Sequence, residues 1–155
     1  MPVSDEREDV LLLDVPSTGD YLSVLPTATA AVATRLGFSL DEIEDLRAAV
    51  NAAVALLIPA ASKQADPGRA RHFRRKPGDE PLRCRLEVGE ETLQIVLSRP
   101  KGEPLPDAGT YQWQVLRALT DEVDSAVEDD TTTIRIRQRR PATEADADTE
   151  RHQIN

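Results

Sequence analysis

The sequence has few of the features that commit a chain to secretion, to a membrane or to a metal. Its single cysteine, Cys84, cannot form an internal disulfide. Its histidines, His72 and His152, stand alone, so we expect no metal site. No apolar run approaches the ~18 residues that a membrane helix needs, and acidic residues stand where a secretory signal has basic ones. We therefore expect a cytoplasmic protein.

Net positive charge and aromatic residues are also lacking. The net charge is −9 and aromatics make up 3% of the chain. Direct binding to nucleic acid or to an anionic membrane needs a basic surface, so neither is expected. An acidic protein is better suited to a basic protein partner. With 155 residues and 39% hydrophobic content, the chain is long enough for one domain with an aliphatic core.

Composition along the chain predicts one folded domain with polar ends. Residues 1–9 are predicted to be a flexible arm, 10–138 the domain, and 139–155 a disordered acidic tail. The one concentrated basic patch, residues 69–76, lies in a Pro/Gly-rich connector. A solvated loop is the simpler interpretation of this patch, and a contact to phosphate or to a partner is the alternative.

The clearest element is a helix over residues 40–58. Ser39 and Glu42 have the spacing of a capping box, and Pro59 ends the helix. Its apolar residues recur at steps of three and four, which predicts one buried stripe: Ile43, Leu46, Val50, Ala53, Val54 and Leu57.

The remaining pattern predicts strands over 10–15, 82–88, 93–97, 123–127 and 132–137, and helices over 21–36 and 111–119. Pro26 means that the first helix either kinks or begins near that proline. In the last helix the apolar positions are Tyr111, Val115, Leu116, Ala118 and Leu119, with Trp113 on the flank. Alternating polar positions in the strands predict that one face of the sheet is exposed to solvent. The expected fold is therefore α+β, a two-layer sandwich whose mixed, mostly antiparallel sheet carries helices on one face.

The run from Asp41 to Arg47 and the small and apolar residues after it resemble the N-box helix of bacterial anti-sigma serine-protein kinases. These belong to the GHKL (Bergerat-fold, histidine-kinase-like) ATPases. In that family the helix supplies a Glu as general base and, four residues later, an Asn that holds magnesium. The alignment places Ala52 and Leu56 at those positions. A methyl group takes no proton and an isobutyl group ligates no hard cation.

Two other nucleotide-binding segments show the same pattern of likeness without the polar residues. The segment from Gly109 to Val123 resembles the family's G2 turn and helix, but Thr110 and Gln112 stand where the resemblance implies glycines. The segment 98–102, at the place of the adenine-reading box, has no Asp and only Gly102. We therefore expect no cofactor. If nucleotide binding is retained, Asn51, Gly102 and Gly109 are the candidate contacts, with ATP and magnesium as ligands.

The resemblance implies an anti-sigma-factor-like regulator of transcription, a pseudokinase that binds a sigma factor, an anti-anti-sigma (STAS-type) protein, or both. It also implies possible homodimerisation, with partner contacts at Tyr21, Leu25 and Arg35. Pro26 stands where the family carries a basic contact residue. The enzymatic alternative is a divergent serine-protein kinase that phosphorylates an anti-anti-sigma protein, with Asn51 and Asp107 as the nearest candidates for its missing ligand and base. A binding module for another partner, such as a phosphatase, is a third possibility.

Overall fold

The computed structural model describes residues 9–17, 19–59, 80–100 and 104–142. The elements in chain order are β1 (Asp9–Val15), the 3-10 turn η1 (Gly19–Tyr21), α1 (Val24–Arg35), α2 (Leu40–Leu57), β2 (Leu82–Val88), β3 (Thr92–Pro100), α3 (Tyr111–Leu119), β4 (Glu122–Glu128) and β5 (Thr131–Arg139). This order of strands and helices is the predicted one.

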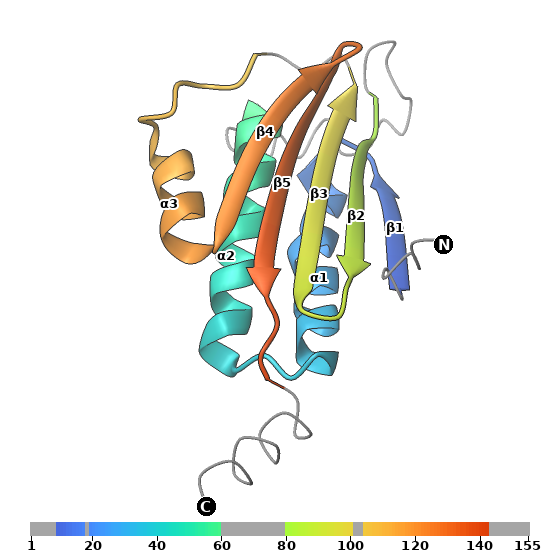
Figure 1. The fold of residues 1–155 in the computed structure, drawn as a ribbon. Helices are drawn as coiled ribbons and strands as arrows, with labels where there is room; N and C mark the ends of the chain where they lie inside the picture. Colours follow the sequence, from blue (N-terminus) through green and yellow to red (C-terminus); the bar gives the residue numbers. More distant parts are fainter. Residues whose placement is uncertain (1–8, 18, 60–79, 101–103, 143–155) are drawn as a thin grey trace, which may run out of the picture.

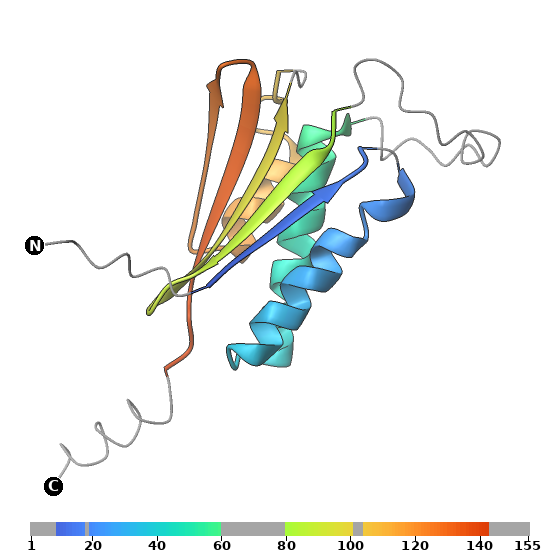
Figure 2. The same cartoon turned by 90° about the vertical axis from the view of Figure 1, so that its right-hand side faces the viewer.

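The strands form one five-stranded sheet in the order β1-β2-β3-β5-β4, and all four pairings are antiparallel. Figure 1 shows α1 and α2 behind this sheet and α3 beside β4, and Figure 2 shows that the helices lie on one face of it. The α+β two-layer fold class is thereby confirmed. The predicted basic patch at 69–76 and most of the predicted arm and tail lie outside the described residues.

The core lies between the sheet and the helices. Alternate residues of the central strands face it, so that Cys84, Leu97 and Ile134 are fully buried. Helix α2 contributes most of the helical side, with Leu46, Val50 and six further residues buried. Full burial of a leucine or valine side chain stabilises the folded state by about 1.5–3 kcal/mol.

The capping box of α2 is confirmed in both of its hydrogen bonds. The backbone N–H of Glu42 donates to Ser39 Oγ (3.2 Å), and the backbone N–H of Ser39 donates to Glu42 Oε2 (2.7 Å). The preceding helix, α1, ends at Arg35. Gly37, just beyond it, has the predicted left-handed conformation, with a φ of +84° that glycine adopts without strain.

The second alternative for the first helix is the correct one. Tyr21 lies in a separate 3-10 turn and α1 begins at Val24, so that Pro26 lies in the first turn. Backbone N–H groups there have no partner within the helix, and proline therefore costs no hydrogen bond at this place.

The predicted inner face of α3 needs correction. Tyr111 is 74% exposed and Ala118 is also exposed, whereas Trp113 and Leu116 are buried. Their spacing of three places both on one side of the helix. The indole N–H of Trp113 donates to the Pro106 carbonyl (3.0 Å), which removes the cost of burying that polar group. Trp113 is thus a core residue.

Candidate functional site

The two positions that the resemblance assigns to catalysis lie on the buried face of α2. Ala52 is 7% exposed and Leu56 is 2% exposed, and both belong to the main hydrophobic cluster. Four residues apart on a helix, they point the same way. Neither side chain offers an oxygen or nitrogen atom, so neither can accept a proton or ligate magnesium. The residues present at these positions do not fit a magnesium–nucleotide complex.

The loop before α3 is tied to the helix that follows it. Three side chains of α3 donate to its carbonyls: Trp113 to Pro106 (3.0 Å), Gln114 to Gly109 (3.1 Å) and Arg117 to Ala108 (3.0 Å). The Arg117 guanidinium also lies 6.0 Å from the centre of the Trp113 ring, within reach of a cation–π contact. The loop is therefore fixed by contacts within the protein.

A further contact joins β3 to α2. Arg99 Nη1 donates to the Leu57 carbonyl (2.8 Å) and so satisfies one of the unpaired carbonyls at the C-terminus of α2. Arg99 belongs to the segment in which the resemblance implies an adenine-reading carboxylate, but this arginine binds backbone. Sequence reasoning missed its role because the partner is 42 residues away.

The residues proposed for a retained nucleotide site or a catalytic base are exposed where the structure describes them. Asn51 is exposed on α2, next to the buried Ala52, and Asp107 is exposed in the loop before α3. A Cβ added at Gly109 would meet no heavy atom within 4 Å, so the described residues give no packing reason for glycine at this position. Gly102 lies outside the described residues.

The predicted partner-binding residues divide into exposed and buried ones. Tyr21, in the turn before α1, is 49% exposed, and Arg35, the last residue of α1, is exposed. Leu25 is 0% exposed, so its predicted role as a contact is wrong for this conformation. It packs in the core because it continues the buried stripe of α1. Pro26 is buried as well. A partner-binding surface at α1 must therefore be built from other residues between Tyr21 and Arg35.

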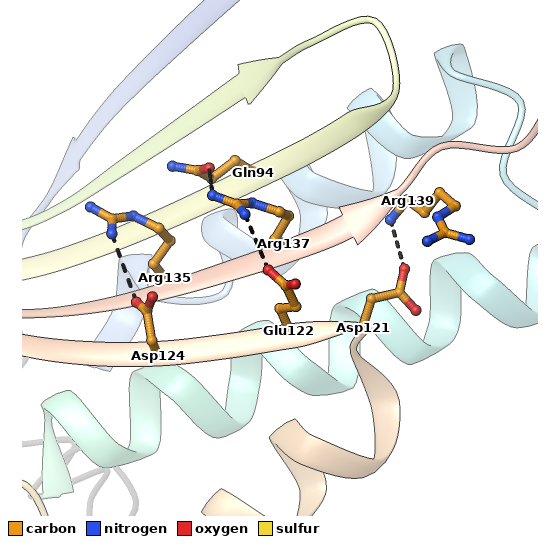
Figure 3. Close-up of polar contacts among 7 residues, drawn as sticks. All are labelled: Gln94, Asp121, Glu122, Asp124, Arg135, Arg137 and Arg139. Carbon is orange, nitrogen blue, oxygen red and sulfur yellow. Dashed lines mark hydrogen bonds and ion pairs between the residues drawn. The ribbon is translucent and has the colours of Figure 1, made fainter.

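The helix-free face of the sheet carries a ladder of charges. Its contacts are drawn in Figure 3. Arg135 Nη1 lies 3.8 Å from Asp124, and Arg137 Nη1 lies 3.1 Å from Glu122. Arg137 Nη2 lies 3.4 Å from Gln94 of β3, and the backbone N–H of Arg139 donates to Asp121 (2.7 Å). The side chains of both ion pairs are well exposed. Such pairs contribute only about 0–1 kcal/mol each.

Near the opposite edge of the sheet from β4, Arg83 of β2 donates two hydrogen bonds to Asp14 of β1, at 2.8 and 3.1 Å. These bonds, more than the charge of Arg83 itself, hold the pKa of the Asp14 carboxyl below its usual value, and they raise the pKa of Arg83. Both groups remain exposed to solvent. The pair contributes to the register of β1 against β2.

Two further chemistries find no support among the described residues. Burial raises the pKa of the Cys84 thiol to about 12, which leaves it protonated and unreactive at neutral pH. No three of the described His, Cys, Asp and Glu side chains gather closely enough to hold a metal ion. Within the same ranges, no helix combines the length and the apolar character needed to cross a bilayer.

The antiparallel five-stranded sheet with three helices on one face is a fold that this chain shares with a solved structure. The RsbU and RsbW domains of Rv1364c from Mycobacterium tuberculosis, seen in a crystal structure, match it with a TM-score of 0.57 and 13% sequence identity. This match covers 86% of this chain and 34% of that one. The likeness shows the shared fold.

Particular relatives are the serine-protein kinases RsbW of Bacillus thuringiensis (strain Al Hakam), Bacillus cereus (strain B4264) and Bacillus anthracis (strain CDC 684 / NRRL 3495). Each is 30% identical over 59 residues, which is 38% of this chain and 37% of the relative. The match thus spans little more than a third of these kinases. No protein-family model matches the chain. The resemblance to anti-sigma serine-protein kinases is confirmed by these similarities.

Proposed function

We propose that this protein is an anti-sigma-type partner-switching regulator that acts by binding alone. In this proposal it holds a sigma factor, an anti-anti-sigma (STAS-type) protein, or each in turn, and it acts in the cytoplasm. The observation that carries the proposal is the combination of an RsbW-like fold with buried hydrocarbon at Ala52 and Leu56. A protein that keeps the scaffold and lacks the base and the metal ligand retains recognition as its function.

The contacts around α3 support a binding role without nucleotide. Phosphates bind at helix N-termini when backbone N–H groups are free to approach them. Here the loop that leads into α3 is already tied to Trp113, Gln114 and Arg117. These bonds engage the carbonyl groups of the loop, and turning its N–H groups toward a phosphate would break them, at a cost of about 0.5–1.5 kcal/mol each.

Two measurements separate this proposal from the kinase alternative. The first is pairwise binding of the purified protein to each sigma factor and each STAS-type protein of its host, measured by calorimetry. We expect one partner of either class to bind with micromolar or tighter affinity, and failure of all pairs would refute the regulator. The second is titration with Mg-ATP, followed by a phosphorylation assay on the bound STAS-type protein. We expect neither heat nor phosphate transfer, and transfer would establish the kinase.

Homodimerisation is proposed through β1, one of the two edges of the sheet. Val10, Leu11 and Leu12 are 44%, 42% and 58% exposed. An exposed apolar edge strand is a ready template for pairing with another chain. Analytical ultracentrifugation of the wild type and of Leu12→Lys tests this proposal. We expect a dimer and a monomer respectively, because an edge lysine must lose its hydration when strands pair; an unchanged mass would remove β1 from the interface.

A further inference from the structure

The second free edge of the sheet is β4, and its chemistry differs from that of β1. Strand β4 pairs with β5 on one side only and stands last in the strand order. Six of its seven residues are exposed, and Val123 is half-buried. Figure 1 shows the strand along the margin of the sheet, with α3 beside it. An open hollow of about 530 Å³ is lined by the end of α3, the first half of β4, and Arg135 and Arg137 of β5.

The hairpin geometry tells which backbone groups of β4 are unpaired. Asp129 and Asp130 have φ values of 50° and 64° and form a two-residue turn that places Glu128 opposite Thr131. Residues that flank such a turn exchange both backbone hydrogen bonds, and bonded pairs recur at every second position. The residues between them direct their N–H and C=O groups to the open edge: Val123, Ser125 and Val127.

The two faces of β4 carry different side chains. Residues directly opposite each other in a sheet share a face. Glu122 and Asp124 lie opposite Arg137 and Arg135, on the helix-free face that Figure 3 shows. The other face carries apolar residues: Val123 is opposite the buried Ile136, and Val127, which is 65% exposed, is opposite the buried Thr132.

The charge of this edge decides which strand it can accept. The segment from Asp121 to Asp130 holds six carboxylates and no basic residue: Asp121, Glu122, Asp124, Glu128, Asp129 and Asp130. Two copies of β4 paired antiparallel about Ser125 would place Glu122 opposite Glu128, and like charges directly opposite destabilise a pair. A second copy of this chain is therefore a poor occupant. Arg137 and Arg135 already pair with Glu122 and Asp124, so the charge that favours a basic strand is that of Glu128, Asp129 and Asp130.

We propose that the free edge of β4 receives an extended segment of another protein in which basic residues alternate with apolar residues. The incoming backbone bonds Val123, Ser125 and Val127. Its basic side chains lie beside the carboxylates of the helix-free face, and its apolar side chains lie beside Val123 and Val127. The surface is defined by the strand itself, so the inference holds whether or not the partner of α1 is a sigma factor.

The test is an amide chemical-shift titration of the isotope-labelled protein with a capped eight-residue peptide that alternates arginine and valine. We expect shifts at the amides of Val123, Ser125 and Val127. Raising the salt from about 20 mM to about 300 mM should weaken binding at least about five-fold, because exposed charge pairs are screened. A matched peptide that alternates glutamate and valine should not bind. Equal binding of the two peptides, or shifts confined to other strands, would overturn the proposal.

Variants of β4 locate the contact. Ser125→Pro removes an N–H that points outward, so the bonds to β5 remain. We expect this variant to bind about ten-fold more weakly, while Ser125→Ala, which keeps the N–H, stays within about two-fold. Glu128→Lys, which leaves the edge backbone intact, should weaken binding at least about three-fold. Unchanged binding by folded Ser125→Pro or by Glu128→Lys would refute the edge. A dimer of the free protein joined through these three amides would assign the edge to a second copy.

Discussion

Replacing Leu56 by asparagine tests whether the site of the family's magnesium ligand has become part of the core. Leu56 is 2% exposed, so Leu56→Asn loses about 2 kcal/mol of burial. It also places an amide within the main hydrophobic cluster, at a further cost of about 1–3 kcal/mol. The sum, about 4 kcal/mol, is a large part of the 5–15 kcal/mol that typically separates folded from unfolded domains.

The assay is urea unfolding followed by circular dichroism. With an m-value of about 2 kcal/mol per molar, a loss of about 4 kcal/mol lowers the midpoint by about 2 M. The matched control is Leu40→Asn, the same substitution at the first residue of α2, where the side chain is 74% exposed. We expect that control to change the free energy of unfolding by less than about 0.5 kcal/mol.

The outcome bears directly on function. If Leu56→Asn unfolds near the wild-type midpoint and acquires magnesium-dependent nucleotide binding, position 56 opens onto a retained site, and the reasoning from burial fails. If it loses stability as expected, the amide that the family uses is incompatible with the packing around α2. Restoring one residue would then not restore an active kinase.

Three smaller perturbations check other parts of the structure. Ser39→Ala should lower the free energy of unfolding by about 1 kcal/mol in the same urea assay, because the capping box loses the Ser39 side-chain bond; no change would mean that the cap is not formed in solution. Cys84 should resist alkylation at pH 8 in the folded protein and react only in denaturant, since its pKa is raised to about 12 and it is buried; rapid native reaction would contradict this burial. Asp130→Gly should raise the thermal midpoint, with a gain of about 0.5–1 kcal/mol, because glycine adopts a φ of +64° without strain; a lower midpoint would contradict the turn geometry.

The element order was predictable because each segment carries a clear period. The apolar stripe of α2 and the alternation of Cys84, Leu86, Ile95 and Leu97 predict a helix layer packed on one face of a sheet, which buries the apolar faces of both. The sequence did not reveal the order of strands in the sheet, which depends on pairings between distant segments. Strand β4 was therefore predicted as a strand, but its place at the edge became visible only in the fold.

Errors at single residues have local physical causes. Leu25 was proposed as a partner contact from the resemblance, although it also continues the buried stripe of α1, and burial prevailed. Trp113 was placed on the flank of α3 because Tyr111, Val115 and Leu119 fit a helical spacing equally well. Trp113 can face the core because its indole N–H donates to the Pro106 carbonyl. Pro106 lies in a loop, which has no periodic pattern in the sequence.

The placement of the two proposed surfaces limits how partners can exchange. Figures 1 and 2 show α1 beneath the β1 side of the sheet, whereas β4 ends the sheet at the other side. We therefore expect a partner on the exposed residues of α1 and a strand on β4 to bind at the same time, because the two surfaces lie apart. We expect the arginine–valine peptide to leave an α1-bound partner in place in a competition experiment by fluorescence anisotropy. Displacement by the peptide would show that the two surfaces are coupled through the sheet, while a protein that releases the partner by simple competition must bind α1 itself.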